Sequence, residues 1–119
     1  MDPLSIAAAV ALFGYIAVVI VAITIEIVTE WFQARGRIKA ENSHAIAFTL
    51  AERIANQDYV KVGGVFNKTS AAASTRVVQG FFDPASGRLL DARALASTRQ
   101  PSRQIVQNHA AGRGLVVYE

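Results

Sequence analysis

The sequence predicts a single-pass transmembrane α-helix followed by a small α+β domain, and three observations lead to this fold class. Residues 3–25 carry no charged side chain. Apolar residues then recur at helical spacing from His44, and from Tyr59 the pattern alternates with period two, as it does in strands. We therefore expect three parts, which are a transmembrane anchor helix over residues 1–32, a basic juxtamembrane stalk over 33–43 and a small α+β cytoplasmic domain over 44–119.

The uncharged run is long enough to cross a bilayer. At about 1.5 Å per residue, a helix over residues 3–25 measures about 35 Å, and the hydrocarbon core is about 30 Å thick. Lipid covers a helix that is apolar on every face, whereas a small domain has no place to bury one. A cleaved signal peptide is disfavoured, since no Lys or Arg precedes the run. A pilin-like helix is the weaker alternative, because no basic leader ending in Gly precedes the run.

The distribution of basic residues predicts the orientation. All 12 Lys and Arg residues follow the run, and the positive-inside rule places the side richer in Lys and Arg in the cytoplasm. We therefore expect an inner or plasma membrane protein with its N-terminus outside and its C-terminal domain in the cytoplasm. The residues predicted to lie at the membrane interface are Glu30, Trp31, Arg35, Arg37 and Lys39.

A second set of residues predicts contact with another helix. Ala7, Ala11, Gly14 and Ala17 share one face of the expected span, and small residues let helices approach closely in lipid. Glu26 ends the uncharged run, where a carboxylate faces either a partner or the headgroups. We expect the partners to be the lipid bilayer and other transmembrane helices, from a second copy or another protein, in an oligomer or complex.

The soluble part predicts a helix, a three-stranded antiparallel meander, a second helix and a terminal strand. The apolar positions Ile46, Leu50 and Ile54 lie four residues apart, which indicates a helix with one buried face. The turn signal in residues 83–87, Asp-Pro-Ala-Ser-Gly, favours a hairpin. The expected elements are a helix over 44–56, strands over 59–66, 75–82 and 88–95, a helix over 101–111 and a strand over 115–118.

No motif with catalytic or cofactor chemistry stands out. The chain has no Cys, which excludes disulfides, thiolate metal sites and Cys nucleophiles. His44 and His109 have no spacing typical of a metal site and are both expected at the surface. The basic residues are scattered, which argues against nucleic acid as a partner. The prediction is thus no catalytic residue, no cofactor and no metal.

Two classes of function follow. The first is a non-enzymatic, membrane-anchored accessory or structural subunit, whose cytoplasmic domain packs in or recruits a larger membrane assembly. The alternative is a membrane-tethered ligand-binding module or enzyme that uses the sheet surface around Gln79, Asp91 and Arg93. A pilin-like or virion membrane structural protein is a further alternative within the structural class.

Overall fold

The computed structural model describes residues 3–13, 16–51, 75–97, 101–112 and 114–118. These residues form a mixed α/β fold around one five-stranded sheet. The elements in chain order are α1 (Pro3–Leu12), β1 (Ala17–Ile20), α2 (Ile25–Ala34), α3 (Gly36–Glu41), β2 (Ile46–Ala51), β3 (Thr75–Asp83), β4 (Arg88–Ser97), α4 (Arg103–Ala111) and β5 (Leu115–Tyr118).

The strands lie in the order β1-β4-β3-β2-β5. Strand β1 runs parallel to β4, and the other neighbouring pairs are antiparallel. In this register Thr49 of β2 lies opposite Gln79 of β3, which in turn lies opposite Arg93 of β4. A row of three polar residues therefore crosses the three middle strands of the sheet.

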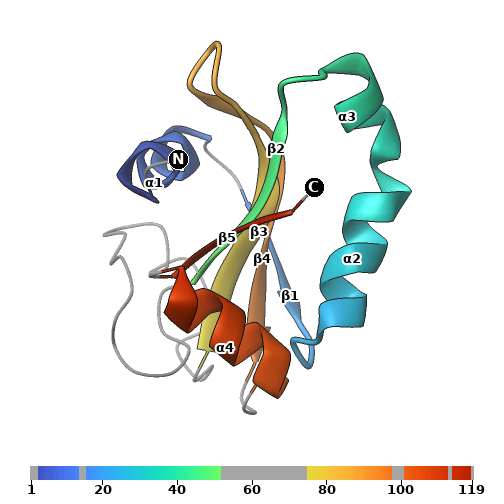
Figure 1. Ribbon diagram of the computed structural model, residues 1–119, viewed down its shortest axis with the longest axis vertical. Helices are drawn as coiled ribbons and strands as arrows, with labels where there is room; N and C mark the ends of the chain where they lie inside the picture. The colour runs from blue at the N-terminus through green and yellow to red at the C-terminus, as the bar shows by residue number, and fades with distance from the viewer. Residues whose placement is uncertain (1–2, 14–15, 52–74, 98–100, 113, 119) are drawn as a thin grey trace.

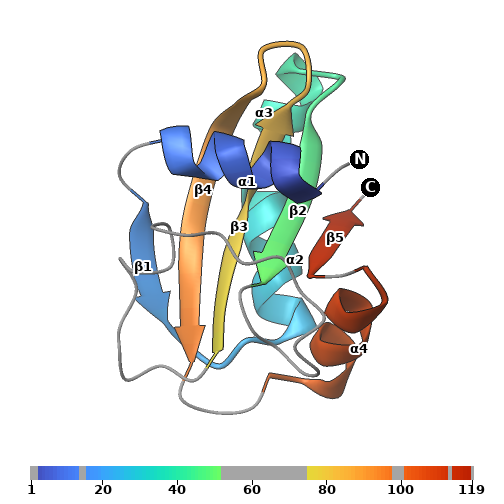
Figure 2. The same ribbon diagram turned by 90° about the vertical axis from the view of Figure 1, so that its left-hand side faces the viewer.

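Helices cover both faces of the sheet. Figure 1 shows α1 on one side and α2 with α3 on the other, and Figure 2 shows α4 beside β5. Because side chains alternate along a strand, Phe48 and Leu50 of β2 contact the α1 layer, and Ala47 and Ala51 belong to the clusters on the α2 side. The core under α1 consists of Ile6, Ala9, Val10, Ile16, Phe48, Leu50, Val78, Phe82, Leu89, Ala92, Ala94 and Leu115.

The predicted transmembrane helix, and with it the single-pass architecture, is wrong. No helix in the described part of the chain is long and apolar enough to cross a membrane. The uncharged run instead contains α1 and β1, and α2 begins at its end, where the Thr24 hydroxyl accepts the Ile27 N–H at 3.2 Å. Such a hydroxyl caps a new helix start and so separates α2 from the preceding strand.

Burial within the fold accommodates part of the uncharged run. Helix α1 buries Ile6 and Val10 on the sheet, and Ile23, just after β1, is buried on the opposite side with Val28 of α2. The residues of β1 are mainly β-branched and pair with β4, which favours an extended backbone over a helix. The predicted localisation and lipid and helix partners stay predictions.

The predicted helix over 44–56 is also wrong where the structure describes it, because Ile46–Ala51 forms β2. This strand lies between β3 and β5 and is covered on both faces. A strand buried on both faces shows no polar alternation, so its apolar spacing also fits a helix. The meander is consequently β2-β3-β4, and the predicted strand over 59–66 lies outside the described residues.

The later elements agree with the sequence. The β3–β4 hairpin is confirmed, with Gly87 at φ 70° and Asp83 accepting bonds from the Ala85 N–H and the Ser86 hydroxyl. Helix α4 and strand β5 are confirmed within a few residues, and β5 enters the sheet beside β2. Between them, Gly114 has a left-handed backbone with φ 92°.

Candidate functional site

The residues predicted for helix packing are distributed over separate elements. Ala7 and Ala11 belong to α1, Ala17 to β1 and Glu26 to the first turn of α2, while Gly14 lies outside the described residues. Ala17 and Glu26 are exposed. The described positions of this set thus belong to three different elements, and their role in helix packing stays a prediction.

The residues predicted to lie at the membrane interface are found on α2, on α3 and at the position between them. Only some of them face solvent. Glu30 and Arg37 are exposed, Arg35 and Lys39 are half-buried, and Trp31 is buried. The Trp31 ring stacks on Phe81 of the sheet, with centroids 5.7 Å apart. Trp31 thus anchors α2 on the sheet.

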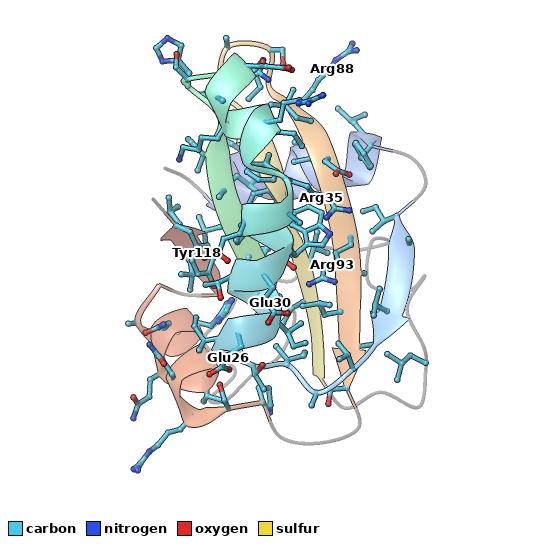
Figure 3. The ribbon with its side chains drawn as sticks, turned by 90° about the vertical axis from the view of Figure 1, so that its right-hand side faces the viewer. Glu26, Glu30, Arg35, Arg88, Arg93 and Tyr118 are labelled. Carbon is cyan, nitrogen blue, oxygen red and sulfur yellow. The ribbon has the colours of Figure 1, made fainter. Side chains whose placement is uncertain are left out.

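An arginine pair surrounds this tryptophan. The guanidinium carbons of Arg35 and Arg93 lie 4.2 and 5.4 Å from the centroid of the Trp31 ring, within the range of cation–π attraction. Arg35 Nε also donates to Asp91 Oδ2 at 2.9 Å. Burial, and secondarily the charge of Arg35, lowers the pKa of Arg93. Figure 3 shows Arg35 and Arg93 on the same side of α2.

The polar row in the sheet is bonded to the backbone of α2. Gln79 is fully buried, and its Nε2 donates to the Val28 carbonyl at 2.7 Å while its Oε1 accepts Arg93 Nε at 2.8 Å. Arg93 donates a second bond to the Ile27 carbonyl at 3.1 Å. Because buried amides need partners, these bonds set the position of α2 on the sheet. The structure thus places Gln79, Asp91 and Arg93 in one neighbourhood beside α2, where Gln79 is buried and Asp91 and Arg93 are half-buried.

A second polar group joins α4 to the sheet. His109 has a relative exposure of 1%, so its predicted surface position is wrong. Its Nδ1 lies 2.8 Å from the Ile105 carbonyl, and its Nε2 lies 2.7 Å from the Thr49 hydroxyl. The carbonyl can only accept, so Nδ1 carries the proton in the neutral ring and Nε2 accepts from Thr49. Tyr118 then donates to Thr49 at 2.9 Å.

Burial sets the ionisation of this second group. It lowers the pKa of His109 and raises the pKa of Tyr118, so both side chains are held neutral. Both ring nitrogens of His109 are used within the protein, which leaves no free lone pair for a substrate or a metal. Within the described ranges, moreover, no three His, Asp or Glu residues are grouped so that they could hold a metal ion.

At the outer edge of β1, unlike in the two polar groups above, backbone hydrogen-bonding groups have no partner strand among the described strands. The Val21 N–H donates to Ala96 of β4, and backbone groups alternate in direction along a strand. The N–H and C=O groups of Val18 and Ile20 therefore point away from β4. Among the described strands, none pairs with this edge. Ile20 and Val19 have relative exposures of 70% and 37%.

The exposed side chains at this edge carry no charge. Residues 3–25 contain none, and Leu12, at the end of α1, is also 79% exposed. Natural edge strands are usually protected by charges, prolines or covering elements. Figure 2 shows β1 at one border of the sheet, beside the end of α1. Sequence reasoning missed this strand, although the β-branched cluster around Val18 and the capping Thr24 were available signals.

Comparison with known proteins assigns no family to this chain, because no family model, curated protein or solved structure matches it significantly.

Proposed function

We propose that the protein is a non-enzymatic assembly subunit that associates with a second copy of itself through the outer edge of β1. The observation that carries the proposal is an outer strand without charges, with exposed Ile20 and Val19 and outward-pointing backbone groups. Two such strands can pair antiparallel across a two-fold axis and join the two sheets. This pairing satisfies the backbone groups of Val18 and Ile20 in both copies.

A second copy fits this edge better than a charged partner does. The full chain has a formal net charge of +3, which opposes the approach of two copies in general. The charged side chain nearest in register, that of Arg93 opposite Ala17, bonds toward Gln79 and α2. The paired strands therefore bring only uncharged residues to the axis. An isologous contact of this kind is also the commonest route to a closed dimer.

The expected affinity is modest because β1 has only four residues. Burying a Val or Ile side chain contributes about 1.5–3 kcal/mol, and less where the side chain is already partly covered. Four such side chains in the dimer contribute at most about 12 kcal/mol. The lost translational and rotational freedom costs about 4–15 kcal/mol, so we expect weak association with a Kd of about 1 mM. Association should therefore be measured at high protein concentration.

Sedimentation velocity over a concentration series tests the proposal. The wild-type chain should shift from monomer toward dimer as its concentration rises. Ile20→Lys should abolish the shift by adding two like charges at the axis. Ile20→Pro should do the same by removing the outward N–H, while the β1–β4 bonds stay intact. Val117→Lys on β5 is the matched control, since Val117 is also exposed on a border strand.

Two results would overturn the proposal. One is a wild-type chain that stays monomeric at millimolar concentration. The other is a dimer that survives both Ile20 variants, or one that only Val117→Lys disrupts, because its contact would then lie elsewhere. Circular dichroism and urea unfolding of each variant separate loss of association from loss of fold.

A further inference from the structure

The end of α1 carries exposed apolar surface. Leu12, its last residue, has a relative exposure of 79%. A hollow of about 360 Å³ lies beside it, and the other lining residues are Ala9, Phe13, Leu89 and Arg88, of which only Arg88 is charged. Figure 2 shows that α1 ends beside the start of β1. This apolar surface therefore borders the strand edge proposed above for association.

Side-chain alternation places the exposed residues of β1 on two faces of the sheet. Ile16 belongs to the cluster under α1, so Ile20, four positions later, lies on the α1 face. Val21 packs with the cluster on the α2 side, so Val19 lies on the α2 face. Leu12 and Ile20 are the two most exposed large apolar side chains among the described residues, and they therefore lie on the same face.

The outward backbone groups of β1 select one register for pairing with a second copy. Within Ala17–Ile20, the residues with outward N–H and C=O groups are Val18 and Ile20. Residues opposite each other in a hydrogen-bonded antiparallel pair exchange two bonds. All these groups of both copies are paired only if Val18 lies opposite Ile20 of the other copy. The two-fold axis then passes between the two Val19 residues.

This register brings the end of α1 toward the strand of the other copy. The axis is perpendicular to the joined sheet, so both α1 helices lie on the same face of it. Because the strands are antiparallel, the end of one β1 lies beside the start of the other, where α1 ends. Leu12 of each copy thus approaches Ile20 of the other, and an isologous dimer contains this apolar contact twice.

We propose that the end of α1 is a second part of the association surface, with Leu12 packed on Ile20 of the other copy in a β1 pairing centred on Val19. This inference rests on the proposed association through β1, to which it adds the register and a second contact. It accounts for a leucine that is exposed at the end of a helix, beside a strand edge without charges.

Disulfide formation between two copies tests the register. The chain has no Cys, so an introduced thiol meets no other thiol in the protein. In the proposed register, the two residues at position 19 form a non-hydrogen-bonded pair with Cα atoms about 4.5 Å apart, within the reach of a disulfide. With oxidised glutathione as oxidant, Val19→Cys should therefore form a covalent dimer at least about tenfold faster than Ala17→Cys.

Ala17→Cys is the matched control for this comparison. Ala17 is exposed on the same strand, two positions from Val19, and so lies on the same face. In the proposed register, however, the two copies of position 17 are separated by about 13 Å along the strands, which is beyond the reach of a disulfide.

A second substitution tests the contact of α1. Leu12→Ser in the Val19→Cys chain should slow formation of the covalent dimer about three- to tenfold, because two leucines lose their apolar contact. Val117→Ser on β5 is the matched control, since Val117 is also exposed but lies at the other end of the strand order. Circular dichroism and urea unfolding check that each variant remains folded.

The outcomes separate this inference from the proposed association. If Ile20→Lys abolishes the dimer in sedimentation but Val19→Cys links no faster than Ala17→Cys, the register is wrong and association through β1 stands. If Leu12→Ser slows linking no more than Val117→Ser does, the contact of α1 is wrong. If Ile20→Lys leaves the linking of Val19→Cys unchanged, both the register and the association through β1 are wrong.

Discussion

The hydroxyl of Thr49 is the central link between α4 and the sheet, and its removal should destabilise the protein more than removal of the neighbouring phenol. Thr49 donates to Nε2 of His109 and accepts from Tyr118. Thr49→Val retains the shape of the side chain and its β-branched character, so strand β2 should keep its packing. The substitution leaves His109 Nε2 without a donor at a position that is 1% exposed.

The magnitude follows from what each variant leaves unpaired. A buried acceptor without a partner costs about 1–3 kcal/mol, and Thr49→Val should lower the free energy of unfolding by that amount. Tyr118→Phe removes a whole hydrogen bond but leaves Thr49 donating to His109, so its cost should be only about 0.5–1.5 kcal/mol. In the double variant the two losses should not add, because the hydroxyls share one bond.

Urea unfolding at pH 7, followed by far-ultraviolet circular dichroism, measures both variants. The midpoint should fall further for Thr49→Val than for Tyr118→Phe, with an unchanged slope m. The reasoning is refuted if Tyr118→Phe is the more destabilising of the two, or if the two losses add fully in the double variant. Either result would mean that His109 does not depend on the Thr49 hydroxyl.

Four further predictions concern other features of the fold. Burial lowers the pKa of His109 below its ordinary value of 6.5, so the imidazole binds a proton more tightly in the unfolded chain than in the folded one. The free energy of unfolding should therefore be highest above about pH 7. Below pH 6.5 it should fall by at most about 1.4 kcal/mol per pH unit. His109→Gln should remove this slope in urea titrations between pH 5.5 and 7, and the same change at exposed His44 should not. Gly80→Ala should lower the free energy of unfolding by about 1–3 kcal/mol, since a Cβ there would lie 2.6 Å from the carbonyl oxygen of Asp91. Gly36→Ala in α3, where a Cβ meets nothing within 4 Å, should be neutral or stabilising in the same assay. Asp91→Asn should lower the free energy of unfolding by at most about 1 kcal/mol, because both side chains of the Arg35–Asp91 ion pair are more than one-third exposed. A larger loss in urea unfolding would contradict the expectation that this ion pair contributes little to stability.

The elements that sequence reasoning located correctly depend on local signals. The turn from Asp83 to Gly87 requires only a side-chain acceptor and one left-handed residue, both of which neighbouring residues supply. The position of α4 follows similarly from a helical segment between Pro101 and the glycines near residue 114. Where the determining contacts lie within a few residues of each other, the sequence was sufficient.

The segments that sequence reasoning misassigned depend on distant contacts. The uncharged run required an apolar cover, but the sequence did not reveal whether lipid or protein provides it. The structure provides it with β4, which pairs with β1, and with the sheet beneath α1. Strand β2 was mistaken for a helix because both its faces are buried, so the alternation that identifies a half-exposed strand is absent.

The sequence by itself determined that residues 3–25 must bury apolar surface and that a hairpin turn ends at Gly87. It also contains the polar residues that lie within the apolar segments. Tertiary structure alone decided what those polar residues do. Thr49 and His109 are 60 positions apart in the chain, and Gln79 meets the backbone of α2 across 51 positions. The small Ala47 lies between Phe81 and Tyr118 only because the register of the sheet brings β3 and β5 to both sides of β2. The reason is physical, since hydrogen bonding and packing act between neighbours in space, and the sheet selects those neighbours from distant parts of the chain.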